Sequence, residues 1–281
     1  MSESQQAVLS ETHQDFVYAL AQIGKDIYAA KASGLYRSTG DGKTWENALA
    51  SLEPNPIAIT DVLEVDGKLF AAATGGIFTS KDGTTWKTVP FRKPSPTLSA
   101  LAASPDPQNK TLFAASLADG VFRSEDAGET WTAWNMGLFD LHVLSLAAGQ
   151  DDQVYAGTET GLYQSKNVGR SWEDVDLPFS HDAVLSLLVK ENELYVGTEN
   201  HGMYKLTGGT WEGLEPPPGA VNQMLSLPHN ELLVLLSDTV YKFQDTFEAW
   251  QGLSGVTRLG VSGENEILLG FSNGEVKGET L

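Results

Sequence analysis

The stretch that decides the fold is residues 110–131, KTLFAASLADGVFRSEDAGETW, which ends in a turn motif and a tryptophan. Three other stretches align with it: KDIYAAKASGLYRSTGDGKTW at 25–45, GKLFAAATGGIFTSKDGTTW at 67–86 and DQVYAGTETGLYQSKNVGRSW at 152–172. Each contains two short runs rich in Val, Leu, Tyr and Phe with a Gly-containing turn between them, and this pattern is typical of β-hairpins. The four copies predict a repeat protein built from β-strands.

The spacing of the tryptophans gives the period of the repeat. Six of the seven tryptophans occupy one repeat position: Trp45, Trp86, Trp131, Trp172, Trp211 and Trp250. The fifth and sixth copies keep little of the motif beyond this tryptophan, and a seventh copy starts at Val256 and ends before reaching one. A period of about 40 residues with four strands in each unit is typical of a β-propeller.

We therefore predict an all-β chain that forms one domain, residues 1–281: a seven-bladed β-propeller with four antiparallel strands, a to d, in each blade. The predicted blades are 15–54, 55–95, 96–138, 139–179, 180–216, 217–254 and 255–281, with residues 7–12 added to the last. The seventh copy lacks a strand d. The amino-terminal segment is predicted to supply it and close the ring, because an open end would expose strand edges.

The turn before the tryptophan resembles the Asp-box motif of BNR-repeat proteins, Ser/Thr-x-Asp-x-Gly-x-Thr-Trp. Residues 124–131 match it at every position, and residues 165–172 match it with Asn167 in place of the aspartate. The chain is similar over nearly its whole length to Asp-box propellers, and its layout resembles photosystem II assembly factor-like and sortilin-like bacterial propeller proteins. The resemblance implies a fold and no particular activity, since one propeller fold hosts many functions.

The motif has a structural explanation. A short carboxylate or amide accepts hydrogen bonds from its own turn, glycine adopts a positive φ, and tryptophan buries a large apolar surface. We therefore assign the motif to folding. Strand order places the a–b and c–d turns on one face of the ring and the d–a and b–c connections on the other. The second face has the longer, more varied segments, and we expect any site there.

On that second face, blades four and five carry histidines and carboxylates that are expected to share one rim. The predicted binding surface comprises His142, Glu159, His181, Asp182, Glu199 and His201. Neutral imidazoles beside carboxylates suit a divalent cation or acid–base chemistry near neutral pH. The candidate metal ligands are His142, His181 and His201, although no spacing typical of metal ligands supports them, and His181 is also a catalytic candidate.

The inner strands provide a second candidate site, at the mouth of the central channel. The aligned positions of strand a are Ala19, Asp61, Ala100, Ser145, Ser186, Met224 and Arg258. Most are small, as a crowded channel requires. Asp61 and Arg258 are expected to form a structural ion pair across the channel mouth, and the alternative is a catalytic role there.

Composition limits the partners. The net charge of -19 comes from 37 acidic and 18 basic residues, and such a field repels nucleic-acid phosphates and anionic membrane surfaces. The chain has no cysteine, which excludes disulfides and thiolate metal sites, and no apolar run of about 18 residues for a membrane span. The amino-terminal residues carry no secretory pattern. We expect a cytoplasmic monomer with neither a nucleic-acid partner nor membrane insertion.

Our preferred interpretation is a non-catalytic scaffold that binds a protein or peptide partner through the d–a and b–c face and holds no cofactor. The alternative is a metal-dependent lyase or hydrolase with its site at the channel mouth. A glycoside hydrolase, which needs two carboxylates about 5–9.5 Å apart, ranks third.

Overall fold

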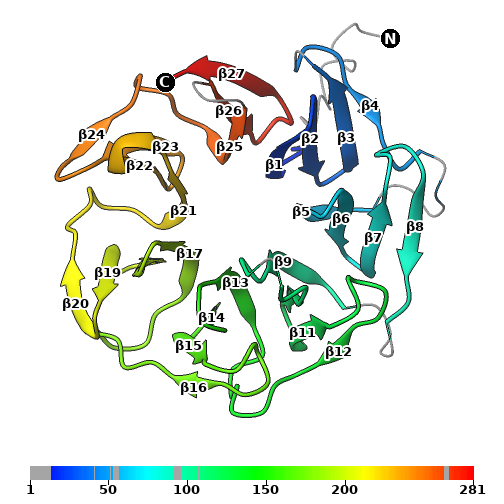
Figure 1. Cartoon of the computed structure of the whole chain (residues 1–281). Coiled ribbons are helices and arrows are strands. Elements are labelled where there is room, and N and C mark those ends of the chain that lie inside the picture. The colour runs from blue at the N-terminus through cyan, green and yellow to red at the C-terminus, as the bar shows by residue number, and fades with distance from the viewer. Residues whose placement is uncertain are drawn as a thin grey trace, which may run out of the picture.

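The computed structural model describes residues 14–40, 42–50, 52, 57–91, 96–106, 108–262 and 266–281. Seven antiparallel sheets surround a central channel (Figure 1). The chain is an all-β, seven-bladed β-propeller built on four antiparallel strands per blade, as predicted. Six blades show all four strands within the described residues, and the described part of the seventh shows three. The one helical segment in the described ranges is a short 3-10 turn, Pro228–Asn230.

The strands of blades 1 to 4 follow chain order, and each pairs with the next. They are β1 (Val17–Ile23), β2 (Asp26–Lys31), β3 (Gly34–Thr39) and β4 (Glu46–Asn47); β5 (Ile59–Val65), β6 (Lys68–Ala73), β7 (Gly76–Ser80) and β8 (Trp86–Val89); β9 (Leu98–Ala103), β10 (Leu112–Ser116), β11 (Gly120–Ser124) and β12 (Thr132–Ala133); β13 (Val143–Ala148), β14 (Val154–Thr158), β15 (Leu162–Ser165) and β16 (Glu173–Asp174).

Blades 5 to 7 continue the same order. They consist of β17 (Val184–Lys190), β18 (Glu193–Thr198), β19 (Met203–Thr207) and β20 (Thr210–Gly213); β21 (Val221–Ser226), β22 (Leu232–Leu236), β23 (Thr239–Phe243) and β24 (Phe247–Ala249); and β25 (Val256–Ser262), β26 (Glu266–Phe271) and β27 (Val276–Thr280). In each blade strand a lines the channel, and the later strands lie progressively further out (Figure 1).

Strand b has four or five consecutive buried residues in every blade. Every residue of β10, β14 and β22 is buried, because both faces of this strand are covered by neighbouring blades. The sequence of such a strand is a continuous apolar run and does not alternate between apolar and polar residues. This explains stretches such as LFAAS and LLVLL in the sequence.

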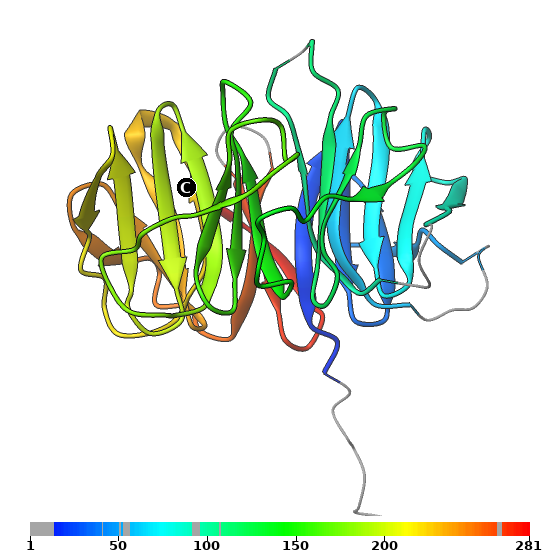
Figure 2. The same cartoon turned by 90° about the horizontal axis from the view of Figure 1, so that it is seen from below.

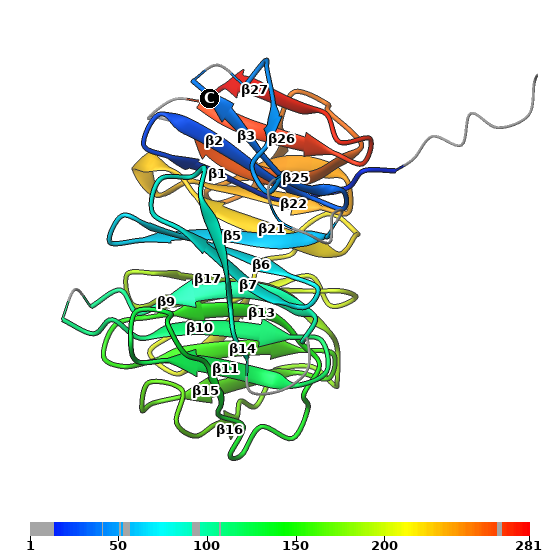
Figure 3. The same ribbon diagram turned by 90° about the vertical axis from the view of Figure 1, so that its right-hand side faces the viewer.

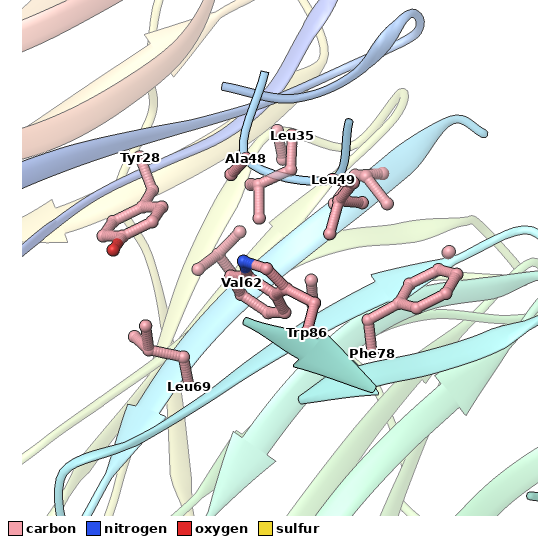
Figure 4. Close-up of a cluster of buried hydrophobic side chains, with 12 residues drawn as sticks. Tyr28, Leu35, Ala48, Leu49, Val62, Leu69, Phe78 and Trp86 are labelled. Atoms are coloured by element: carbon pink, nitrogen blue, oxygen red, sulfur yellow. The ribbon is translucent and has the colours of Figure 1, made fainter. Parts of the chain in front are cut away.

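The core lies between blades, as the contact of blades 1 and 2 illustrates (Figure 4). Tyr28 and Leu35 of blade 1 belong to one buried cluster with Val62, Leu69 and Trp86 of blade 2. Trp86 is 4% exposed, so the repeat tryptophan serves the packing between blades. Burial of each aliphatic side chain of such a cluster contributes about 1.5–3 kcal/mol.

Strand a contains a bulge near its start in every blade. In blade 6 the pairing shifts between Val221 and Gln223, as it does between Ile59 and Asp61 in blade 2. The residue that corresponds to Asp61 is therefore Gln223. The sequence alignment that placed Met224 at this position was wrong by one residue, and Met224 is instead a buried core residue.

The strands run between two faces of the ring (Figure 2). The c–d turns of blades 2 to 4 have the hydrogen bonds expected of a structural motif. In blade 3, Gly128 N donates to Ser124 Oγ at 2.8 Å, and Asp126 Oδ1 accepts from Glu129 N and Thr130 N at 3.0 and 2.9 Å. These turns fix the start of strand d. The face of the ring that carries the a–b and c–d turns is called the a–b/c–d face.

The described residues of blades 7 and 1 meet directly, with β25 beside β1 (Figure 3). Thr257 Oγ1 donates to Val17 O at 3.0 Å, and Lys31 Nζ donates to Gly274 O at 2.6 Å. Gly270 has no side chain where Val17 packs against it, and a Cβ there would overlap with Val17. The predicted closing strand at residues 7–12 lies outside the described residues.

Candidate functional site

The face that carries the d–a and b–c connections is organised by aspartates that accept hydrogen bonds from neighbouring loops. Asp182, in the connection from blade 4 to blade 5, is 6% exposed and accepts hydrogen bonds from the b–c loop of blade 5. Asn200 N and His201 N donate to Asp182 Oδ2 at 2.8 and 3.0 Å, and Asn200 Nδ2 donates to Oδ1 at 2.9 Å. Asp182 therefore holds two loops together.

Two other blades repeat this arrangement. In blade 4, Asp140 Oδ2 accepts from Thr160 N at 3.1 Å and from Thr160 Oγ1 at 2.8 Å. In blade 1, Asp15 accepts from Ser33 N at 2.9 Å and from Ser33 Oγ at 2.8 Å. An aspartate before strand a thus fixes the b–c loop in each case, and its carboxylate oxygens are occupied by protein donors.

The hydrogen bonds of Asp182 govern its protonation. Burial alone would raise the pKa of this carboxyl group, but the hydrogen bonds from His201 and Asn200 outweigh it and lower the pKa to about 2. His201 Nδ1 lies 2.9 Å from Asp182 Oδ2, an arrangement in which Nδ1 carries the proton and donates it. His142 Nδ1 lies 3.3 Å from Asp140 Oδ1 in the equivalent pair of blade 4.

An aromatic cluster extends from this aspartate. The Phe179 ring stacks on His201 with centroids 4.7 Å apart and lies 4.8 Å from the Tyr204 ring. Tyr204 in turn meets Trp211 edge to face at 6.5 Å. His201 and Tyr204 also line a pocket of about 320 Å³, whose other wall includes the connection Pro216–Pro218 between blades 5 and 6. We call this hollow the aromatic–proline pocket.

The remaining residues of the predicted binding surface lie nearby without joining one cluster. His181, Glu159 and Glu199 are exposed on the same face. Glu159 N donates to His142 O at 3.2 Å and Glu199 N donates to Ala183 O at 3.0 Å, so both glutamates sit in b–c loops tied to the preceding connection. Over the described ranges, no group of three or more His, Asp or Glu side chains is arranged to hold a metal ion. The three candidate histidines thus form no common ligand set there.

The channel mouth contains Asp61 and Arg258 in one pocket of about 220 Å³. Every lining residue is among the first four residues of an inner strand, which places this mouth on the d–a/b–c face. No ion pair within 4.0 Å joins the two side chains, so the expected salt bridge is not formed. Arg258 donates to Tyr18 O and to Asn222 O instead, and Asp61 accepts from Leu101 N at 2.7 Å.

Asp61 remains the most perturbed carboxyl group of the channel. Burial raises its pKa to about 6, opposed by hydrogen bonds from Leu101 and Val62 and by the charge of Arg258. A carboxyl group that titrates near pH 6 is suited to proton transfer, but both oxygens already accept backbone N–H groups.

Asp61 belongs to a ring of bonds from one inner strand to the next. Ser145 Oγ donates to Val184 O at 3.0 Å, and Ser186 Oγ donates to Val221 O at 2.7 Å. Four more side chains connect inner strands: Ser99, Gln223 and Arg258 donate such bonds, and Asp61 accepts one from Leu101 N. The polar side chains of the inner strands therefore connect blades, which explains why they occur at a crowded position.

Sequence reasoning did not find the aromatic cluster. Phe179 and Tyr204 come from different elements, the connection before β17 and strand β19, and nothing in their spacing along the chain predicts that their rings meet. The three consecutive prolines at Pro216–Pro218 were the available signal, because the fixed φ of proline makes a segment rigid, and rigid segments occur in peptide recognition.

Comparison with known proteins supports the fold. The model of a family described as the DUF6242 beta propeller domain matches residues 2–139. No curated protein sequence matches the chain. The extracellular domain of BT4673 from B. thetaiotaomicron superposes with a TM-score of 0.79 at 19% identity, covering 94% of this chain and 38% of that one. The chain therefore spans little more than a third of that relative's length.

Two further solved structures cover most of both chains. YCF48 bound to D1 peptide has a TM-score of 0.76 at 12% identity and covers 95% of this chain and 92% of that one. A streptogramin B lyase has a TM-score of 0.77 at 12% identity, with coverage of 97% and 96%. At these identities the likeness shows the fold alone.

None of the described residues forms a helix with the length and apolarity needed to cross a lipid bilayer. The chain is a β-propeller whose structural neighbours have varied functions.

Proposed function

We propose that the chain is a non-catalytic propeller scaffold of the BNR-repeat type that binds a protein or peptide partner through its d–a/b–c face. The observation that carries the proposal is the aromatic–proline pocket, where His201 and Tyr204 face the connection Pro216–Pro218. The rings of His201 and Tyr204 and the three prolines give the pocket rigid walls, which lower the entropic cost of binding a peptide. YCF48, which has the same fold, was solved with a bound peptide.

The surroundings of the pocket favour binding over catalysis. Asp182 and Asp140 accept hydrogen bonds from neighbouring loops, so these carboxylates hold the surface in place. His201 stacks on the Phe179 ring and uses Nδ1 for its contact with Asp182, and its Nε2 suits a hydrogen bond to a backbone group of a bound peptide. The pocket therefore combines aromatic and proline side chains with a fixed polar group.

A photocrosslinking experiment tests this proposal. Phe179 is replaced by p-benzoylphenylalanine, and the full chain is irradiated in an extract of its source organism. We expect one discrete protein adduct, and we expect Tyr204→Ala in the same background to reduce its yield at least tenfold. Tyr241→Ala is the matched control, because Tyr241 holds the same strand position in blade 6 and does not line the pocket. The proposal would be refuted if no adduct formed, or if Tyr204→Ala left the yield of the adduct unchanged.

The alternative proposal, a metal-dependent lyase or hydrolase at the channel mouth, has one favourable observation. Asp61 lies in a pocket of about 220 Å³ with a pKa raised by burial to about 6. Turnover of any substrate that is abolished by Asp61→Asn, with the fold intact, would replace the scaffold proposal with this one.

A further inference from the structure

A second hollow lies on the a–b/c–d face, between blades 4 and 5. Its volume is about 420 Å³, and its floor includes Tyr155 on β14, which is 7% exposed. Gln153 and Gln164 of blade 4 line one side, and Val189 and Leu206 of blade 5 line the other. This is the face on which the sequence predicts only structural turns, and the aromatic–proline pocket lies on the opposite face.

Three other junctions fill the corresponding space with a turn. The glycine of each c–d turn packs against an aromatic ring on strand b of the preceding blade: Gly83 on Tyr28, Gly128 on Phe70 and Gly169 on Phe113. Tyr155 occupies the same position in blade 4, since it pairs with Gln164 as Phe113 pairs with Arg123. The ring that should receive the turn of blade 5 is therefore present.

The turn that would cover Tyr155 is shortened. In blade 4, eight residues from Ser165 to Trp172 separate the paired residues Gln164 and Glu173. In blade 5, six residues from Leu206 to Trp211 separate the corresponding pair. The tip of this turn is Gly208 and Gly209, and a Cβ on either would meet nothing within 4 Å. The short turn leaves the space over Tyr155 open.

The polar groups of the hollow are held in fixed positions. Tyr155 Oη donates to Gln153 Oε1 at 2.6 Å, and Gln164 Nε2 donates to the same oxygen at 3.1 Å. Gln153 Nε2 and Gln164 Oε1 have no hydrogen-bond partner among the described residues. A fixed N–H donor beside a fixed carbonyl acceptor matches the C=O and N–H groups of a peptide turn.

The charge of the residues that line the hollow indicates the sign of the partner's charge. Asp151 and Glu191 line the hollow and form no ion pair within the described part of the chain. Lys and Arg are absent from its lining, and the whole chain carries a net charge of -19. A cationic segment is attracted to such a rim, and an acidic segment is repelled.

We propose that this hollow binds a glycine-containing turn with Lys or Arg residues, presented by a partner protein. The bound turn would take the place over Tyr155 that a c–d turn of the chain itself fills at three other junctions. The glycine lies against the ring, the backbone pairs with Gln153 and Gln164, and the basic side chains face Asp151 and Glu191.

The first test uses a cyclic peptide with the sequence of residues 165–172, SKNVGRSW, which contains a turn glycine, one Lys and one Arg. Calorimetric titration of the full chain is expected to show one-to-one binding that Gln164→Ala weakens at least tenfold. Thr79→Ala is the matched control: Thr79 holds the same position in blade 2, where the Phe70 ring is covered by Gly128, and this variant should bind like the wild type.

The second test fills the hollow from within. Replacing residues 206–211 by the eight residues 165–172 gives blade 5 a full-length turn, and circular dichroism verifies that the variant is folded. We expect the grafted chain to lose binding of the cyclic peptide at least tenfold. Absence of peptide binding by the wild type would overturn the proposal, and so would binding as tight as that of the wild type in the grafted chain or in Gln164→Ala. Displacement of the peptide by a neutral oligosaccharide would also overturn it and assign the hollow to sugars.

Discussion

At the scale of single residues, the environment of Asp61 predicts an unusual pH dependence of stability. Burial raises its pKa from 3.8 to about 6, so the folded chain keeps this proton when the unfolded chain has lost it. The stabilising effect is complete below pH 4 and is lost as the pH rises through 6, with an upper limit of about 3 kcal/mol. In urea unfolding, the stability of the wild type relative to Asp61→Asn should fall by about 2–3 kcal/mol between pH 4 and pH 7.

Asp182 provides the control, because its pKa is shifted in the opposite direction to that of Asp61. Its pKa is lowered to about 2 by hydrogen bonds that outweigh burial, so its contribution is present above pH 4 and is lost as the pH falls through 2. The stability of the wild type relative to Asp182→Asn should therefore decrease on acidification. A pH-independent difference for Asp61→Asn, or the same slope for both variants, would contradict the environments described for these carboxyl groups.

At the scale of an element, the c–d turn depends on close approach as well as on backbone conformation. Gly128 has a φ of 79°, and a Cβ there would overlap with the Phe70 ring of the preceding blade. Gly24, in the a–b turn of blade 1, has a φ of 63° with nothing within 4 Å of the added atom. Gly24→Ala should cost about 1 kcal/mol for left-handed strain alone. Gly128→Ala should cost about 1–3 kcal/mol more because of overpacking.

Thermal and denaturant unfolding of the two glycine variants measure this difference. Equal losses would mean that the turn moves freely over Phe70, against the packing described here. The same comparison bears on the hollow over Tyr155, since the close fit of a turn glycine on an aromatic ring is the contact that blade 5 lacks.

At the scale of the whole molecule, Arg258 joins three blades. It lies on β25 of blade 7 and donates to Tyr18 O of blade 1 and to Asn222 O of blade 6. Arg258→Ala should lower the free energy of unfolding by about 2–3 kcal/mol, since bonds from a charged donor contribute about 1.5–3 kcal/mol. Amide exchange should rise most in β1 and β25, because local opening starts where inter-blade bonds are lost.

Arg37→Ala is the matched control for ring closure. Arg37 pairs with Asp26 and Glu46 inside blade 1, so its loss leaves the junction of blades 7 and 1 unchanged. Faster exchange of β25 in this variant, or unchanged exchange of β25 in Arg258→Ala, would show that Arg258 does not close the ring.

The sequence by itself determined the architecture. The tryptophan at a period of about 40 residues, the apolar strand b and the Gly-containing turns are local signals, and each copy repeats them. The prediction of a seven-bladed all-β ring followed from these signals and is confirmed. The hydrogen bonds of the c–d turns could also be read from the sequence, because the side chains of Ser124 and Asp126 contact backbone only a few residues away.

The tertiary structure alone decided the candidate sites. A one-residue bulge moved Gln223 into the position assigned to Met224, and such a shift reverses the side on which each side chain points. Three features of the candidate sites depend on contacts between connections, loops or blades that are well separated along the chain. They are the burial of Asp182, the stacking of Phe179 on His201 and the open space over Tyr155. A repeat encodes the strands and turns of each blade, whereas a pocket depends on what the neighbouring blade places across the junction.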